Sequence, residues 1–192
     1  MRTIEEYEKL LWEKYQQSNN PEIEERYLHS LSVKKKALEI SDTFNLNVDR
    51  EKAALAAVLH DYAKFDTLER FKEIISKYHL NEEILKCPQT LHSILGPYII
   101  KEELGLKDQE ILEAIENHAL GSLEMSKLGE VLFLADFTEE NREGPVFTEA
   151  KQLSKIDFYQ AILAKIKCKL ETYPDELSSK LYQKYQEVQC KS

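Results

Sequence analysis

The apolar residues of this chain recur every three or four positions over nearly its whole length, and this spacing constrains the fold more than any other feature. It matches the 3.6-residue period of an α-helix, and no stretch alternates apolar and polar residues for long enough to indicate a β-strand. Only 5 Gly and 5 Pro interrupt the pattern. We therefore expect an all-α fold. The expected helices cover about 4–15, 21–44, 49–64, 67–78, 91–104, 108–118, 126–137, 148–172 and 174–189, with a short one from 81.

The length and charge of the chain narrow the class of protein. Its 192 residues suit a single domain, 1–192, with a sizeable core. A net charge of -9 argues against a general DNA- or RNA-binding protein, because such proteins cluster Lys and Arg against phosphates. Cys87, Cys168 and Cys190 follow no CxxC spacing, which favours a reducing compartment over a disulfide framework or a zinc knuckle.

The chain shows no targeting or membrane-spanning pattern. Residues 1–15 lack the basic start and apolar run of a signal peptide, and no apolar run approaches the ~18 residues that span a bilayer. We expect a cytoplasmic protein without a membrane partner. Its oligomeric state stays open.

Four of the five histidines lie at positions expected to face the core. His29, His60, His92 and His118 each share a helical face with apolar residues, on four different predicted helices. A single inward histidine is more often a hydrogen-bonded core residue. Four together favour a metal site instead, whereas His79 lies beside a polar turn and is expected at the surface.

Two acidic residues strengthen the metal interpretation. Asp61 directly follows His60, and Asp136 ends the apolar run 131–135. A carboxylate in such a place is unfavourable unless a cation receives it. A His/Asp cluster without cysteine suits Fe, Mn, Co or Zn, and the spacing does not select among them.

The order of these residues resembles a known family. The series His29, His60-Asp61, His92, His118 and Asp136 is similar to the H…HD…H…H…D signature of the HD superfamily, in its bacterial YqeK branch. The resemblance covers about 26–153 and leaves 154–192 as additional C-terminal helices. Local context agrees in the segments 59–64, 91–96, 114–121, 125–126 and 133–142.

The resemblance implies a fold, a reaction and a metal centre. The expected fold is an HD-domain helical bundle with extra N- and C-terminal helices. The expected reaction is symmetrical hydrolysis of diadenosine tetraphosphate to two ADP, with a metal-bridging hydroxide as nucleophile. Two metal ions are expected, iron first, with Mn, Co or Zn as alternatives. By resemblance one ion is held by His29, His60, Asp61 and Asp136 and the second by His92 and His118, with Asp61 bridging.

Three residues are expected to act with Asp61 on the substrate. Lys64 lies four residues after His60, so a helix through 49–64 would place both on one face, where the ammonium could stabilise phosphate charge. Arg142 follows Asp136 in a loop broken by Gly144-Pro145, and its planar fork suits a phosphate. We expect Asp61, Lys64 and Arg142 to be catalytic, and Lys64, Gly121 and Arg142 to contact the substrate.

Two positions depart from the usual family pattern. Ala119 stands where the family usually has Thr, and Pro97 stands where Ala is usual. The missing hydroxyl bears on rate or specificity. These departures leave open a catalytically silent nucleotide-binding or regulatory HD module. Because the metals and fold would be the same, an HD phosphohydrolase of a nucleoside monophosphate or of guanosine tetraphosphate is the other alternative.

Overall fold

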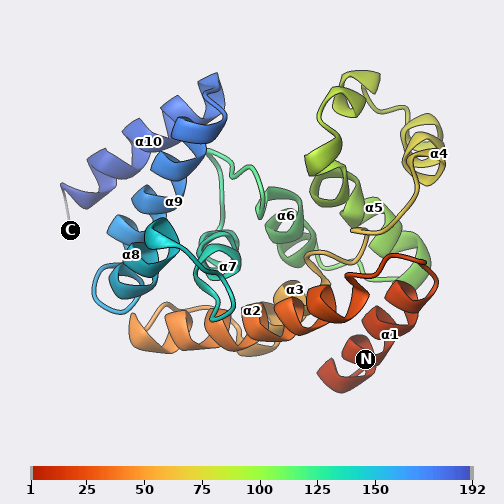
Figure 1. Ribbon diagram of the computed structural model, residues 1–192, viewed down its shortest axis with the longest axis horizontal. Coiled ribbons are helices and arrows are strands. Elements are labelled where there is room, and N and C mark those ends of the chain that lie inside the picture. The colour runs from red at the N-terminus through yellow and green to blue at the C-terminus, as the bar shows by residue number, and fades with distance from the viewer. Residues whose placement is uncertain (1, 191–192) are drawn as a thin grey trace.

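The computed structural model describes residues 2–190, which contain ten α-helices, two short 3-10 helices and no strand (Figure 1). The predicted all-α class is confirmed. The elements are α1 (Ile4–Gln16), α2 (Ile23–Thr43), α3 (Arg50–Leu59), α4 (Leu68–Tyr78), η1 (Glu82–Lys86), η2 (Pro88–Thr90), α5 (Leu91–Leu104), α6 (Gln109–Asn117), α7 (Lys127–Thr138), α8 (Pro145–Leu153), α9 (Phe158–Thr172) and α10 (Glu176–Gln189).

The central helices α2, α3, α6 and α7 pack against one another, with α5 against α6. Small residues permit this close approach, since Ala53, Ala56 and Ala57 of α3 are almost completely buried. Helix α1 packs on α3, and α4 packs on α5. At the other side α9 packs on α7 and α8 and forms an antiparallel pair with α10. In Figure 1, α9 and α10 stand opposite the segment from η1 to α5, above the floor that α2, α3, α6 and α7 form.

Most helices begin at a side chain that accepts a hydrogen bond from the first turn. This capping satisfies backbone N–H groups that lack a partner within the helix. Asp49, Thr67 and Ser126 all act in this way. Thr3, Asp108, Asp157 and Asp175 do so as well.

Two of the predicted helices are wrong in extent. The helix expected over 49–64 ends at Leu59, and residues 60–65 form successive turns. The helix expected over 148–172 is two helices, α8 and α9, which are separated at 154–157. Asp157 caps the new helix by accepting from the Gln160 N–H, so a polar side chain begins α9 where apolar periodicity alone suggests continuity.

Along the described part of the chain, no helix is long and apolar enough to cross a membrane. His79 is exposed, as predicted. It ends α4 with a positive φ of 53°.

Candidate metal centre

The six residues expected to bind metal converge at the floor formed by α2, α3, α6 and α7. They come from five places: α2, the turn after α3, the first turn of α5, the end of α6 and the last turn of α7. His29, His60, Asp61, His92 and His118 are buried, and the Asp136 side chain is 15% exposed. Segments more than a hundred residues apart thus supply one cluster.

Asp61 lies at the centre of this cluster. Its Oδ1 lies 3.1 Å from His92 Nε2 and 3.7 Å from His118 Nε2. Its Oδ2 lies 3.4 Å from His60 Nε2 and 4.0 Å from His29 Nε2. Two groups of three potential ligands result, His29-His60-Asp61 and Asp61-His92-His118, and they share this carboxylate.

Three of the imidazoles present the form that binds metal. Nδ1 of His60 donates to the carbonyl of Ala57, and Nδ1 of His118 donates to the carbonyl of Ile115, both at 2.7 Å. His29 Nδ1 donates to a carboxylate oxygen of Glu139 at 3.2 Å. Since carbonyls and carboxylates only accept, Nδ1 carries a proton in each of these rings, and in the neutral ring Nε2 turns its lone pair toward the cluster.

The cluster therefore gathers acceptors without enough donors. Asp61 Oδ1 is buried and accepts no hydrogen bond. His60 Nε2 faces His29 Nε2 at 3.3 Å, and both face carboxylate oxygens. Lone pairs converging in a buried place are unfavourable unless a cation lies between them. The donor set of imidazole nitrogens and carboxylate oxygens fits divalent metal ions of intermediate hardness.

The protonation behaviour of the cluster agrees with its donor set. Burial, together with the nearby His60, holds the pKa of His118 well below its usual range, so this ring is neutral. Burial alone would raise the pKa of Asp61, but the neighbouring His60 and His92 and the ammonium of Lys64 hold it well below its usual range. The carboxylate at the centre is thus ionised.

Asp136 lies beside this centre with strong partners of its own. Its Oδ1 is 3.3 Å from His29 Nε2 and accepts a hydrogen bond from Arg142 at 2.8 Å. Its Oδ2 accepts from Lys165 at 3.3 Å. Burial would raise the pKa of Asp136, yet Lys165, His29 and Arg142 hold it well below its usual range.

A cleft of about 730 Å³ opens above the cluster. Arg26, Lys64 and Arg142 supply positive charge at its inner end, where Arg26 contacts Asp61 Oδ2 at 3.2 Å. One wall is made by residues of η1, η2 and α5, and the other by the end of α9 and the connection to α10. Such a cleft suits an anionic ligand whose charge lies over the cluster.

Comparison with known proteins identifies the family. The HD domain family model matches residues 26–166. This chain belongs to the HD domain family.

Relatives of this HD protein agree in length and sequence. The "bis(5'-nucleosyl)-tetraphosphatase, symmetrical" of Bacillus subtilis is 37% identical over 75% of this chain and 77% of that protein. The protein of the same name from Halalkalibacterium halodurans is 33% identical over 81% of this chain and 87% of that protein. The crystal structure of a "predicted HD superfamily hydrolase involved in NAD metabolism" from Clostridium acetobutylicum has the same fold, with a TM-score of 0.81 and 24% identity over 94% of this chain and 97% of that one.

Lys64 and Arg142, the two cationic residues expected to contact the substrate of this HD protein, both line the cleft. Lys64 lies in the turns after α3 and not on a helical face, so the spacing argument for it was wrong. Its Nζ nevertheless lies 3.4 Å from His92 Nε2 and 4.0 Å from Asp61 Oδ1. Arg142 directs its guanidinium to Asp136, through the carboxylate and the backbone carbonyl.

Gly121 was expected to contact the substrate, but the structure does not place it on the cleft lining. It has a φ of +76°, which favours glycine. A Cβ at this position would lie 3.0 Å from Leu181 Cδ1 and 3.3 Å from a Phe133 ring carbon. Gly121 therefore permits close packing between the end of α6, α7 and α10.

The two departures from the family pattern lie in different surroundings. Ala119 lines the cleft, where its methyl adds apolar surface in place of a hydroxyl. Pro97 is buried inside α5, away from the lining.

Three residues around the centre escaped prediction. Arg26 precedes His29 by three residues and so shares its helical face. Lys165 is a buried lysine among the apolar residues Ile162 and Ile166 of α9, a pattern that signals a buried partner. Glu139 is almost completely buried beside His29, and only the tertiary fold brings them together.

Proposed function

We propose that this HD protein hydrolyses diadenosine tetraphosphate symmetrically to two ADP and depends on metal ions for doing so. The observation that carries the proposal is the shared carboxylate of Asp61 between two groups of histidines at the floor of a cationic cleft. The relatives named as symmetrical bis(5'-nucleosyl)-tetraphosphatases support this choice of substrate.

Two metal ions are proposed at the centre, with iron expected first. His29, His60, Asp61 and Asp136 would hold one ion, and His92 and His118 the other, with Asp61 shared. Metal ions in such pairs supply a nucleophile from water at neutral pH and polarise phosphoryl oxygens. The lone pairs of three Nε2 atoms and the free acceptor Asp61 Oδ1 support this arrangement.

The residues of the chain would orient the polyphosphate and balance its charge. The oxygen of a water molecule would bond to one inner phosphorus while the bond from that phosphorus to the central bridging oxygen breaks. This oxygen would leave with the second ADP and carry its negative charge, and the protons of the water would pass to solvent. Lys64 and Arg26 lie beside Asp61, where their cationic groups can face phosphate oxygens. Arg142 has its Nη2 on Asp136, so it would align the carboxylate and offer its remaining donors to the substrate.

We place this reaction in the bacterial cytoplasm, in keeping with the bacterial relatives and the absence of disulfides among the three cysteines. The acidic composition disfavours DNA or RNA as a partner.

Product analysis tests the proposed reaction. Protein loaded anaerobically with iron or manganese is incubated with diadenosine tetraphosphate, and the products are separated by chromatography. We expect ADP alone. ATP with AMP would contradict symmetrical cleavage, and turnover only of a nucleoside monophosphate or of guanosine tetraphosphate would favour those substrates. Failure to hydrolyse any nucleotide would favour a silent binding module.

Elemental analysis of Asp61→Ala tests the shared ligand. We expect near-complete loss of metal and of activity, because both groups of ligands lose their common carboxylate. Asp66→Ala is the matched control, since Asp66 is also a largely buried aspartate but pairs with Lys14 outside the cluster. Retention of metal and activity by Asp61→Ala would overturn the assignment.

A further inference from the structure

The C-terminal helices contribute a wall of the cleft that the HD motif does not include. The family match ends at residue 166, whereas the cleft lining continues through Lys169 to Thr172, Tyr173, Pro174 and Asp175. These four last residues lie where α9 ends and α10 begins. Figure 1 shows this end of the α9–α10 pair facing the segment from η1 to α5.

Tyr173 is an unusual surface residue. It is 64% exposed, and among the large apolar side chains in residues 2–190 only Ile156 is more exposed. The other exposed ones, such as Tyr78 and Leu123, lie away from the cleft, whereas Tyr173 lines it. An aromatic ring left open beside a cationic site is available to stack on a planar ligand.

The connection that carries Tyr173 is held at both ends. The Tyr173 N–H donates to the carbonyl of Lys169 at the end of α9. Asp175 accepts from the Ser178 N–H and so begins α10. Lys169 ties the connection to the cleft floor, because its Nζ donates to the carbonyl of Leu120 and lies 3.5 Å from Asp175. Because the backbone of this connection is fixed in this way, it loses little conformational entropy when a ligand binds.

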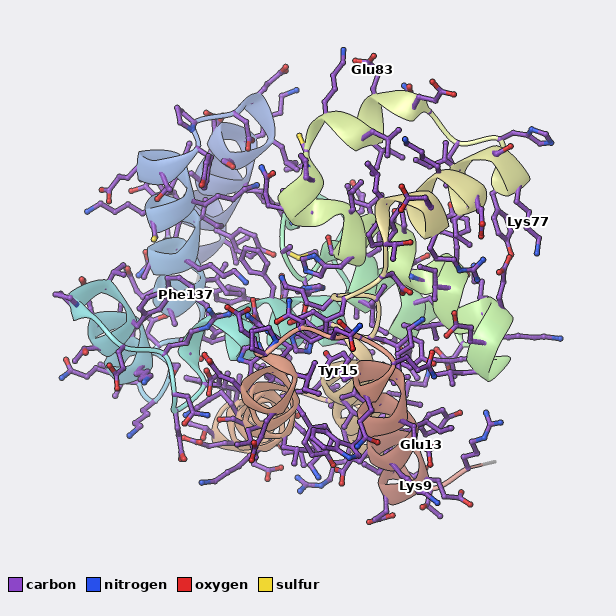
Figure 2. All side chains as sticks on the ribbon, turned by 45° about the vertical axis from the view of Figure 1, so that its right-hand side comes forward. Lys9, Glu13, Tyr15, Lys77, Glu83 and Phe137 are labelled. Atoms are coloured by element: carbon purple, nitrogen blue, oxygen red, sulfur yellow. The ribbon has the colours of Figure 1, made fainter. Side chains whose placement is uncertain are left out.

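The facing wall offers complementary chemistry. Ile84 and Ile94 line this wall with aliphatic surface, and Gln89 lines it with an amide. In Figure 2 the label of Glu83 marks η1, the first segment of this wall. A nucleobase has two apolar faces and a polar edge, so an aromatic ring on one side and aliphatic groups with an amide on the other suit it.

The charge distribution sets the direction of such a ligand. Arg26, Lys64 and Arg142 lie at the inner end, over the candidate metal centre, and Tyr173 lies on the outer wall. We propose that the α9–α10 connection forms a nucleoside-binding subsite with the wall opposite, in which Tyr173 stacks on one nucleobase of the substrate. This inference rests on the proposed function for the identity of the ligand.

Substitution of Tyr173 tests the subsite. For Tyr173→Ala we expect KM for diadenosine tetraphosphate to rise by about 5- to 150-fold, with the effect in KM rather than in kcat, because base stacking contributes about 1–3 kcal/mol. The affinity for ADP, measured by calorimetry, should fall in parallel. Tyr173→Phe keeps the ring and should restore both values.

Tyr78→Ala is the matched control, because it removes a partly exposed tyrosine of α4 outside the cleft. Inorganic tetraphosphate serves as a ligand without a base, and its affinity, measured by calorimetry like that of ADP, should fall much less in Tyr173→Ala. Unchanged ADP affinity in Tyr173→Ala would overturn the subsite, as would equal losses for ADP and inorganic tetraphosphate. Failure of the proposed function is distinguishable, because the wild-type protein would then release no ADP from diadenosine tetraphosphate while ADP binding still reports on the subsite.

Discussion

Lys165 uses all three protons of its buried ammonium within the protein. Its Nζ donates to Asp136 Oδ2 at 3.3 Å, to the carbonyl of His118 at 3.0 Å and to the carbonyl of Phe133. An ammonium has no further proton for a phosphate. Burial lowers its pKa to about 8, while Asp136 opposes this effect. Lys165 is therefore a positioning residue that holds Asp136 and the end of α6 together.

Removal of this ammonium should weaken metal binding. For Lys165→Met we expect the affinity of the protein for metal to fall by about 10- to 100-fold, because residues that orient metal ligands commonly have effects of this size. Competition with a chromogenic chelator measures the affinity. Lys169→Met is the control, since Lys169 lies one turn further along α9 and contacts Leu120 and Asp175 instead. Equal affinities in the wild type and Lys165→Met would contradict the positioning role.

Glu139 should make the metal-free protein sensitive to acid. Burial raises its pKa, but hydrogen bonds from His29, Ser32 and the Asn141 N–H lower it to about 2 from an ordinary value of 4.5. The stabilisation that the ionised Glu139 carboxylate gives the folded protein is therefore complete above pH 4.5 and is lost as the pH falls toward 2.

Urea unfolding of the metal-free protein at about pH 5.5 and about pH 3 measures this contribution. Between these pH values the free energy of unfolding should fall by about 2 kcal/mol more in the wild type than in Glu139→Gln, since the amide does not titrate. Glu140→Gln alters the exposed neighbour, whose ion pair with Lys35 is solvated and contributes little to stability, so its pH dependence should stay close to that of the wild type. The prediction fails if Glu139→Gln shows the same pH dependence as the wild type.

At this scale the sequence predicts which side chains turn inward more readily than which partners they meet. His29, His92 and His118 could be placed inward because each lies at helical spacing from apolar residues. The sequence around Arg26 and around Glu139 shows no unusual pattern. Around Lys165 the one unusual feature is a lysine at a buried position of α9. Their contacts depend on how α2, α7 and α9 pack, and no local pattern specifies that packing.

Among the elements, the turn after α3 shows where helical periodicity misleads. The apolar pattern continues through Ala63, so it predicts a longer helix. Residues 60–65 instead form turns, in which the Tyr62 and Lys64 N–H groups donate to carbonyls three residues earlier. The buried Tyr15, labelled in Figure 2, donates its hydroxyl to the carbonyl of Asp61 at 2.9 Å. This contact from α1 supports the turn that presents Asp61.

The link between α6 and α7 has a packing requirement at Gly121. For Gly121→Ala we expect a loss of about 1–3 kcal/mol in the free energy of unfolding, because the new Cβ meets Leu181 of α10 and φ is positive. Chemical denaturation measures this value. The KM for diadenosine tetraphosphate should stay near that of the wild type at temperatures where the variant is folded.

Gly105→Ala provides a comparison for this effect. Gly105 also has a positive φ, of 69°, but a Cβ added there would have no atom within 4 Å. It should therefore lose less stability than Gly121→Ala. A large rise in KM for Gly121→Ala with unchanged stability would restore the substrate contact that the sequence suggests.

Over the whole molecule, the cleft joins parts that differ in how readily they are predicted. The family resemblance indicates the all-α fold and the residues of the floor, because their order along the chain is distinctive. The division into α8 and α9 and the outer wall at Tyr173 could not be derived in this way. They depend on the cap at Asp157 and on the packing of α9 against α7. The substrate consequently meets a floor supplied by the HD motif and a wall supplied by the C-terminal helices.

Because cleavage occurs at the floor and the base binds at the wall, the products report the distance between these two places as a number of phosphates. If Tyr173 holds one nucleobase while cleavage occurs over Asp61, the number of phosphates between them is set by the protein and not by the length of the substrate. Diadenosine pentaphosphate should then yield ADP and ATP, because two phosphates stay with the bound nucleoside. Chromatography of early time points measures this pattern, and release of AMP with adenosine tetraphosphate would contradict it. In Tyr173→Ala the fraction of AMP should increase, since the base no longer fixes the register of the phosphates over the metal centre.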